Sequence, residues 1–115
     1  MMSYPDDSNG DVLRRLEKAN FDFSLEYAVD FYAVYETEEE ADIVAKQFAR
    51  DWKEGHKFKN IETRPAETGG MELELVPIMN VTYENITNFE IRLAERTSKV
   101  NGYLDGWGVL CEQHS

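Results

Sequence analysis

The chain has 115 residues and carries 12 Lys and Arg against 23 Asp and Glu, so its formal net charge is -11. This length fits a single domain with a core of its own. An acidic surface repels phosphate groups, which argues against direct nucleic-acid binding and against binding to an anionic membrane. The charge favours association with basic surfaces, so we expect a protein partner.

Targeting signals are not evident in the sequence. No stretch approaches the roughly 20 apolar residues that cross a membrane. The first residues lack the basic and apolar parts of a secretory signal. The single cysteine, Cys111, excludes an intrachain disulfide, as is usual in a reducing compartment. Together these features predict a cytoplasmic protein.

Residues 1–10 are expected to form a flexible lead-in, and residues 11–115 a single domain. Ser8 or Asn9 can cap a first helix that stops near Asn20. The apolar face of this helix would carry Val12, Leu13, Leu16 and Ala19. 

A strand and a helix are predicted next. Residues 25–35 alternate in the way typical of a strand, with one face formed by Tyr27, Val29, Phe31, Ala33 and Tyr35. Thr37-Glu38-Glu39-Glu40 matches a capping box, in which the Thr37 hydroxyl accepts an N–H and Glu40 reaches back. The helix is expected to end at Gly55. Its apolar stripe is Ala41, Val44, Ala45, Phe48 and Trp52.

Two strands are predicted after this helix. In residues 57–63, Phe58 and Ile61 fall on opposite faces unless a bulge intervenes. A turn at Thr68-Gly69-Gly70 leads to a strand over residues 71–76. Regular pairing is expected to end at Pro77, because proline has no N–H to donate.

A third helix is predicted over residues 83–100, with Asn101-Gly102 as its cap, and a last strand over residues 103–112. After the first helix the order is therefore βαββαβ. This order predicts an α+β sandwich of the ferredoxin-like kind, in which an antiparallel sheet carries two helices on one face. The other face is left for solvent or a partner.

No catalytic or metal-binding pattern is recognisable. His56 and His114 are isolated and belong to no H-x-x-x-H or H-E-x-x-H pattern. Cys111 lies in an apolar strand, where a buried and inert thiol is the usual case. We therefore expect no enzyme activity, no metal and no cofactor.

Two segments are candidate partner-binding sites. The acids after Thr37 form either a solvated first turn or a docking patch for a basic partner, made of Glu38, Glu39 and Asp42. In the glycine-rich segment 102–108, Trp107 either fills the core or is an exposed anchor at an interface. The candidate contacts in this segment are Tyr103, Asp105, Gly106, Trp107 and Gly108.

The run Tyr103-Leu104-Asp105-Gly106-Trp107-Gly108, followed by an apolar pair and Glu112, resembles the tyrosine–aspartate–glycine–tryptophan–glycine signature of the regulator of ribonuclease activity B family. Leu104 interrupts the motif. The resemblance implies a ferredoxin-like fold and a regulator that binds and inhibits ribonuclease E by contacting the protein rather than RNA. The alternative is a small-molecule-binding or homodimeric ferredoxin-like module, with Tyr27, Tyr32 and Tyr103 lining the open sheet face or a dimer groove.

Overall fold

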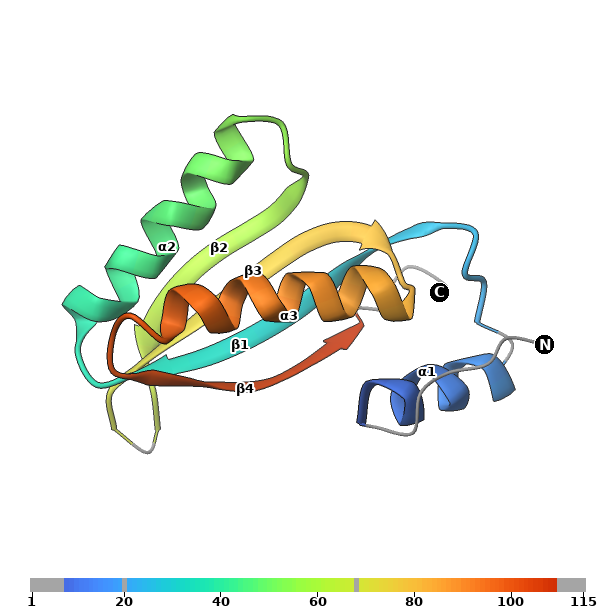
Figure 1. The fold of residues 1–115 in the computed structure, drawn as a ribbon, viewed down its shortest axis with the longest axis horizontal. Coiled ribbons are helices and arrows are strands. Elements are labelled where there is room, and N and C mark those ends of the chain that lie inside the picture. The colour runs from blue at the N-terminus through green and yellow to red at the C-terminus, as the bar shows by residue number, and fades with distance from the viewer. Residues whose placement is uncertain (1–7, 20, 68, 110–115) are drawn as a thin grey trace.

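The structure, a computed structural model, describes residues 8–19, 21–67 and 69–109. Its elements are α1 (Ser8–Lys18), β1 (Glu26–Tyr35), α2 (Glu38–Lys53), β2 (Phe58–Pro65), β3 (Met71–Asn80), α3 (Tyr83–Thr97) and β4 (Gly102–Val109). The predicted α+β class is confirmed, and the βαββαβ order follows α1 (Figure 1). No helix in the described ranges is both long and apolar enough to cross a membrane.

The strands form one sheet in the order β2-β3-β1-β4, and every neighbouring pair is antiparallel. The two central strands are thus β1 and β3, while β2 and β4 are the edges. Both α2 and α3 lie on the same face of this sheet, and α1 lies beyond the end of β4 (Figure 1). The prediction of two helices on one face of an antiparallel sheet therefore agrees with the arrangement.

The core lies between the sheet and the two helices. The predicted inner face of β1 is buried at Val29, Phe31, Ala33 and Tyr35. The ring of Phe31 lies 4.4 Å from that of Phe89 on α3, and Phe89 lies 5.3 Å from Phe48 on α2. Burial of such aromatic rings is the main source of stability in a core of this size.

The ends of α2 are formed by the residues that the sequence indicates. Oγ1 of Thr37 accepts the backbone N–H of Glu40 at 3.2 Å, and the same hydroxyl donates to Oε1 of Glu40 at 3.1 Å. Glu54 is the C-cap, and Gly55 follows with a φ of 118°, which glycine adopts without strain. The capped helix is thus confirmed.

The prediction that pairing ends at Pro77 is wrong. Strand β3 continues to Asn80, and it pairs with β1 as far as Glu26. The expected bulge in β2 is present between Phe58 and Asn60, and Phe58 lies opposite Pro77. Because the bulge already interrupts the ladder at this point, the missing N–H of the proline is tolerated in a central strand.

Other boundaries also differ from the prediction, and β2 ends at Pro65 rather than at residue 63. The first helix begins at Ser8, so it includes residues 8–10 of the expected lead-in. The third helix ends at Thr97 rather than at residue 100, since Ser98 Oγ donates to the Glu95 carbonyl at 2.7 Å and a turn follows. Gly102 consequently belongs to β4 and is not a cap. Residues 1–7 and 110–115, which include Cys111 and His114, lie outside the described residues.

Candidate functional site

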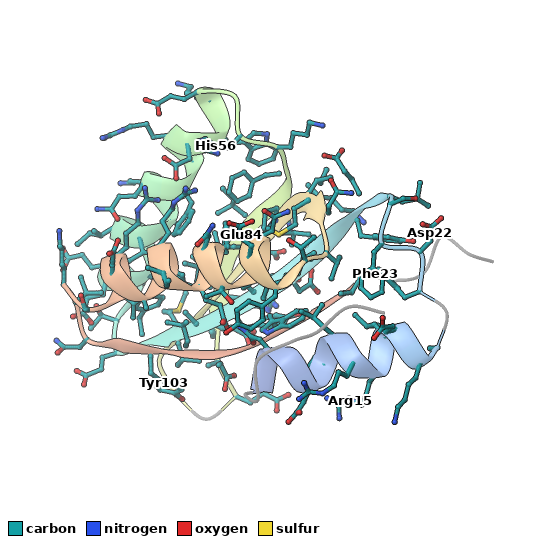
Figure 2. All side chains as sticks on the ribbon, turned by 45° about the vertical axis from the view of Figure 1, so that its right-hand side comes forward. Arg15, Asp22, Phe23, His56, Glu84 and Tyr103 are labelled. Atoms are coloured by element: carbon teal, nitrogen blue, oxygen red, sulfur yellow. The ribbon has the colours of Figure 1, made fainter. Side chains whose placement is uncertain are left out.

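One face of the sheet carries neither α2 nor α3, and no helix in the described ranges packs on it. We call it the helix-free face. It is formed by alternate side chains of the four strands, namely Asp30, Tyr32 and Val34 of β1, Glu62 and Arg64 of β2, Glu72 and Glu74 of β3, and Tyr103 and Asp105 of β4. In Figure 2, Tyr103 projects from β4 on the side away from α2 and α3.

A single guanidinium group joins three carboxylates on this face. The cross-strand register places Arg64 opposite Glu72, and Glu62 opposite Glu74. Nε of Arg64 lies 3.0 Å from Glu72, Nη2 lies 3.0 Å from Glu74, and Nη1 lies 3.6 Å from Glu62. Burial alone would lower the pKa of Arg64, but the hydrogen bond of Glu74 and the charges of Glu74, Glu72 and Glu62 together raise it. The arginine therefore stays charged and holds the edge strand β2 to β3.

Asp30 is a buried carboxyl group at the centre of the helix-free face. Its side chain is 7% exposed, and the phenol of Tyr32 donates to its Oδ2 at 2.9 Å. The same hydroxyl lies 3.4 Å from Oε2 of Glu74. Burial raises the pKa of Asp30, and the charge of Glu74 adds to the effect; burial likewise raises the pKa of the Tyr32 phenol. Oδ1 of Asp30 accepts no hydrogen bond from the described residues, so it is an unused acceptor.

The predicted residues Tyr103 and Asp105 lie together at the edge of this face. With Val34 and Arg64 they line a hollow of about 590 Å³. Asp105 is the extra residue of a bulge, because the pairing passes from Tyr32 with Gly106 to Ala33 with Leu104. Tyr103 is 56% exposed and is free to contact a partner.

The structure places Trp107 on the opposite side, facing α3. Its ring stacks on Phe31 with centroids 6.2 Å apart, and its Nε1 donates to Oδ1 of Asn9 at 2.8 Å. It is partly buried against the core, which agrees with the core interpretation. Gly106 and Gly108, opposite Tyr32 and Asp30, are on the helix-free face, so Trp107 is separated from the other members of its motif.

The predicted acidic patch belongs to the start of α2. Glu38 and Glu39 are exposed and Asp42 is half-buried. Glu40 has a structural role instead: its Oε2 accepts the backbone N–H of Asn101 at 3.1 Å and the side-chain amide at 2.8 Å. The Asn101 backbone N–H is the main cause of the lowered pKa of Glu40. Glu40 thereby ties α2 to the loop before β4.

The three tyrosines proposed to line a ligand site do not share one surface. Tyr32 and Tyr103 lie on the helix-free face, whereas Tyr27 packs beside the core with its ring 4.5 Å from Phe21. The expectation that Tyr27 lines the open sheet face is therefore wrong, because side chains at odd and even positions of β1 point to opposite faces.

The cluster around Arg64 was missed at the level of the sequence. Glu72 and Glu74 lie on β3, and the arginine that joins them lies on β2, the other strand of a hairpin. The turn at residues 68–70 is the signal that could have found it, since a hairpin brings the residues on either side of its turn into register.

No group of three or more His, Cys, Asp and Glu side chains in the described part of the chain is arranged to hold a metal ion. That statement does not extend to Cys111 and His114.

Residues 6–109 match the family model described as Regulator of ribonuclease activity B. The match covers all the helices and strands of the described ranges. No curated protein matches the sequence.

Proposed function

We propose, because the chain belongs to the regulator of ribonuclease activity B family, that it regulates a ribonuclease by binding to it as a protein and catalyses no reaction itself. We further infer that the target is ribonuclease E, that binding inhibits this enzyme in the cytoplasm, and that RNA turnover is slowed as a result. The segment from Tyr103 to Gly108 supports this choice of target by its resemblance to the family signature.

The observation that carries the proposal is the acidic helix-free face with its exposed aromatic edge. Carboxylates outnumber the cations there, and Asp105 is exposed at its edge. A basic surface of a partner would find complementary charge on this face, and Tyr103 would supply an aromatic anchor. Asp105 lies beside this tyrosine and can pair with an arginine or lysine of the partner.

The arrangement of the face also supports a binding role over a catalytic one. Glu72 and Glu74 are engaged with Arg64, and Asp30 with Tyr32, so these carboxylates are held by structural contacts. The βαββαβ order and the antiparallel sheet support our inference that the fold is ferredoxin-like. Such folds host many unrelated functions, so the site and not the fold carries the proposal.

A small-molecule-binding module is the alternative. The observation that favours it is the hollow of about 590 Å³ beside Tyr103, which has a charged and aromatic lining. A ligand that bound there would raise the melting temperature by mass action. 

The test uses the purified full chain and purified ribonuclease E from the same organism. Binding is measured by calorimetry, and inhibition by cleavage of a labelled single-stranded RNA. We expect Tyr103→Ala and Asp105→Lys each to weaken binding and inhibition by about tenfold or more. The matched control is Glu95→Lys, an exposed charge reversal on α3, on the other side of the sheet, and it should change neither.

The outcomes test the target, the contact surface and the alternative function separately. Absence of binding and inhibition by the unmodified chain would show that ribonuclease E is the wrong target, while binding to another ribonuclease would preserve the regulatory role. Equal losses in Glu95→Lys and Asp105→Lys would argue against the helix-free face as the contact surface. A metabolite that raises the melting temperature of the unmodified chain but not of Tyr103→Ala would favour the alternative.

A further inference from the structure

The outward side of α2 is divided into an acidic half and a basic half. The acidic half carries Glu38, Glu39 and Asp42, and the basic half carries Lys46, Arg50 and Lys53. Positions 39, 42, 46, 50 and 53 are three or four residues apart, so they form one stripe along the helix. None of these six side chains forms an ion pair with another residue of the described part of the chain, so the stripe is available to an external partner.

Apolar groups accompany this stripe. Trp52 of α2 is 41% exposed and lies beside the basic half. Trp52 and Ala49 line, together with the three cations, a shallow hollow of about 730 Å³. An exposed aromatic ring among unpaired cations is typical of an interface more than of a merely solvated surface.

We propose that α2 packs antiparallel against α2 of a second copy of this chain, which forms a homodimer around a two-fold axis near Lys46. The antiparallel arrangement reverses the order of charges. Glu39 and Asp42 of each copy then face Lys53 and Arg50 of the other, and the same contacts occur twice, as an isologous interface requires. Ala49 and Trp52, which line the hollow beside the basic half, supply the apolar part of the contact.

A second copy fits this surface better than other acidic or basic partners do. An RNA strand that lay on the basic half would continue onto Glu39 and Asp42, which repel phosphate. A short acidic peptide would cover Lys46, Arg50 and Lys53 but would leave the acidic half unpaired. The second copy pairs Glu39 and Asp42 with Lys53 and Arg50 in both directions, while Lys46, near the axis, faces the Lys46 of the other copy.

The size of the surface predicts a weak dimer. The 16 residues of α2 extend about 24 Å, and one pair of such helices covers less than the roughly 1,200–2,000 Å² of a stable interface. Dimerisation should therefore depend strongly on concentration. Because α2 and the helix-free face lie on opposite sides of the sheet, the dimer goes beyond the proposed ribonuclease contact and is tested without a ribonuclease.

The experiment is sedimentation equilibrium of the full chain at near-physiological salt. One variant reverses the acids, Glu39→Lys with Asp42→Lys, and the other reverses the bases, Arg50→Glu with Lys53→Glu. We expect each variant alone to lose association by about tenfold or more, because every altered pair occurs twice and becomes a like-charge pair. An equimolar mixture of the two variants should recover association as a heterodimer, and so should a chain that carries all four substitutions.

The control is Glu84→Lys with Glu95→Lys, which changes the net charge as much as the acid reversal but on α3; it should associate like the unmodified chain. Circular dichroism checks that each variant is folded. An unmodified chain that stays monomeric at millimolar concentration would overturn the proposal, and so would a mixture that fails to recover association. If base reversal abolished binding of an RNA or of an acidic peptide while dimerisation was unchanged, the surface would belong to that other partner.

Discussion

Nε1 of Trp107 donates a hydrogen bond of 2.8 Å to Oδ1 of Asn9, a residue 98 positions earlier in the chain. Nδ2 of the same asparagine donates to Oε1 of Glu90 at 2.6 Å. One buried side-chain amide therefore connects β4, α1 and α3, because both its oxygen and its NH2 group form hydrogen bonds. This contact explains how a short first helix is fixed to the end of the sandwich, where it also buries Leu13.

The Trp107 contact predicts a loss of stability on a conservative substitution. Trp107→Phe keeps a ring over Phe31 but leaves the buried Oδ1 of Asn9 without its donor, which should cost about 1–3 kcal/mol in the free energy of unfolding measured in urea. Trp52→Phe is the control, since Trp52 is 41% exposed, and its effect should be smaller. In a double-mutant cycle, Trp107→Phe and Asn9→Ala should cost less together than the sum of the two. Strict additivity would contradict the coupling.

Two glycines of β4 differ in what an added methyl group would meet. A Cβ at Gly102 would lie 2.7 Å from Cε1 of Tyr35 and 2.8 Å from the Val34 carbonyl oxygen, whereas at Gly108 nothing lies within 4 Å. Tyr35 is buried and its hydroxyl is paired with Thr97 at 2.7 Å, so its ring cannot move freely. We expect Gly102→Ala to cost about 1–3 kcal/mol and Gly108→Ala much less, measured as thermal and urea unfolding. A larger loss for Gly108→Ala would refute this account.

Local signals predicted much of the fold. The alternation in residues 25–35 and the capping box at Thr37 depend on neighbours in the chain, and both appear in the structure. The extent of β3 does not depend on neighbours alone. Pro77 is tolerated because the bulge at Phe58–Asn60 lies in the partner strand, and the pairing of strands was not fixed by the local pattern.

The candidate site was also predicted only where it depends on neighbours in the chain. The glycine-rich run singled out Tyr103 and Asp105, which do lie side by side on the helix-free face. Trp107 belongs to the same run but faces the other way, since neighbouring strand positions alternate. The Arg64 cluster depends on the register of β2 against β3, which the turn between these strands indicates but the pattern within either strand does not.

The ion pair between α2 and α3 predicts that replacing Arg96 by lysine lowers the stability of the fold. Nη1 and Nη2 of Arg96 lie 2.9 and 3.4 Å from the two carboxylate oxygens of Asp51, and its Cζ lies 4.4 Å from the ring centre of Phe48. Lysine can neither form the paired contact nor stack its planar group. We expect Arg96→Lys to cost about 1–2 kcal/mol in urea unfolding. Arg92→Lys on the same helix is the control, and an equal loss there would argue that the Asp51 contact is not the cause.

The raised pKa of Asp30 predicts how stability changes with pH. Because the folded state holds this proton to a higher pH than the unfolded chain does, ionisation of Asp30 destabilises the fold. This loss of unfolding free energy is absent below the ordinary pKa of 3.8. It grows as the pH rises from there to the folded-state pKa, and it is constant at higher pH. Glu74 adds to the cost, while the charge of Lys59 opposes it.

Asp30→Asn removes this titration while its amide oxygen can still accept the Tyr32 hydroxyl. The variant should therefore gain stability relative to the unmodified chain as pH rises, with the difference reaching a plateau at neutral pH. Asp22→Asn is a control of opposite sign, since the side-chain and backbone hydrogen bonds from Ser24 lower the pKa of Asp22 and favour its ionised form. Its stability relative to the unmodified chain should fall as pH rises. Urea unfolding from about pH 3 to pH 8 measures both differences, and a pH-independent difference for Asp30→Asn would contradict the buried-carboxyl account.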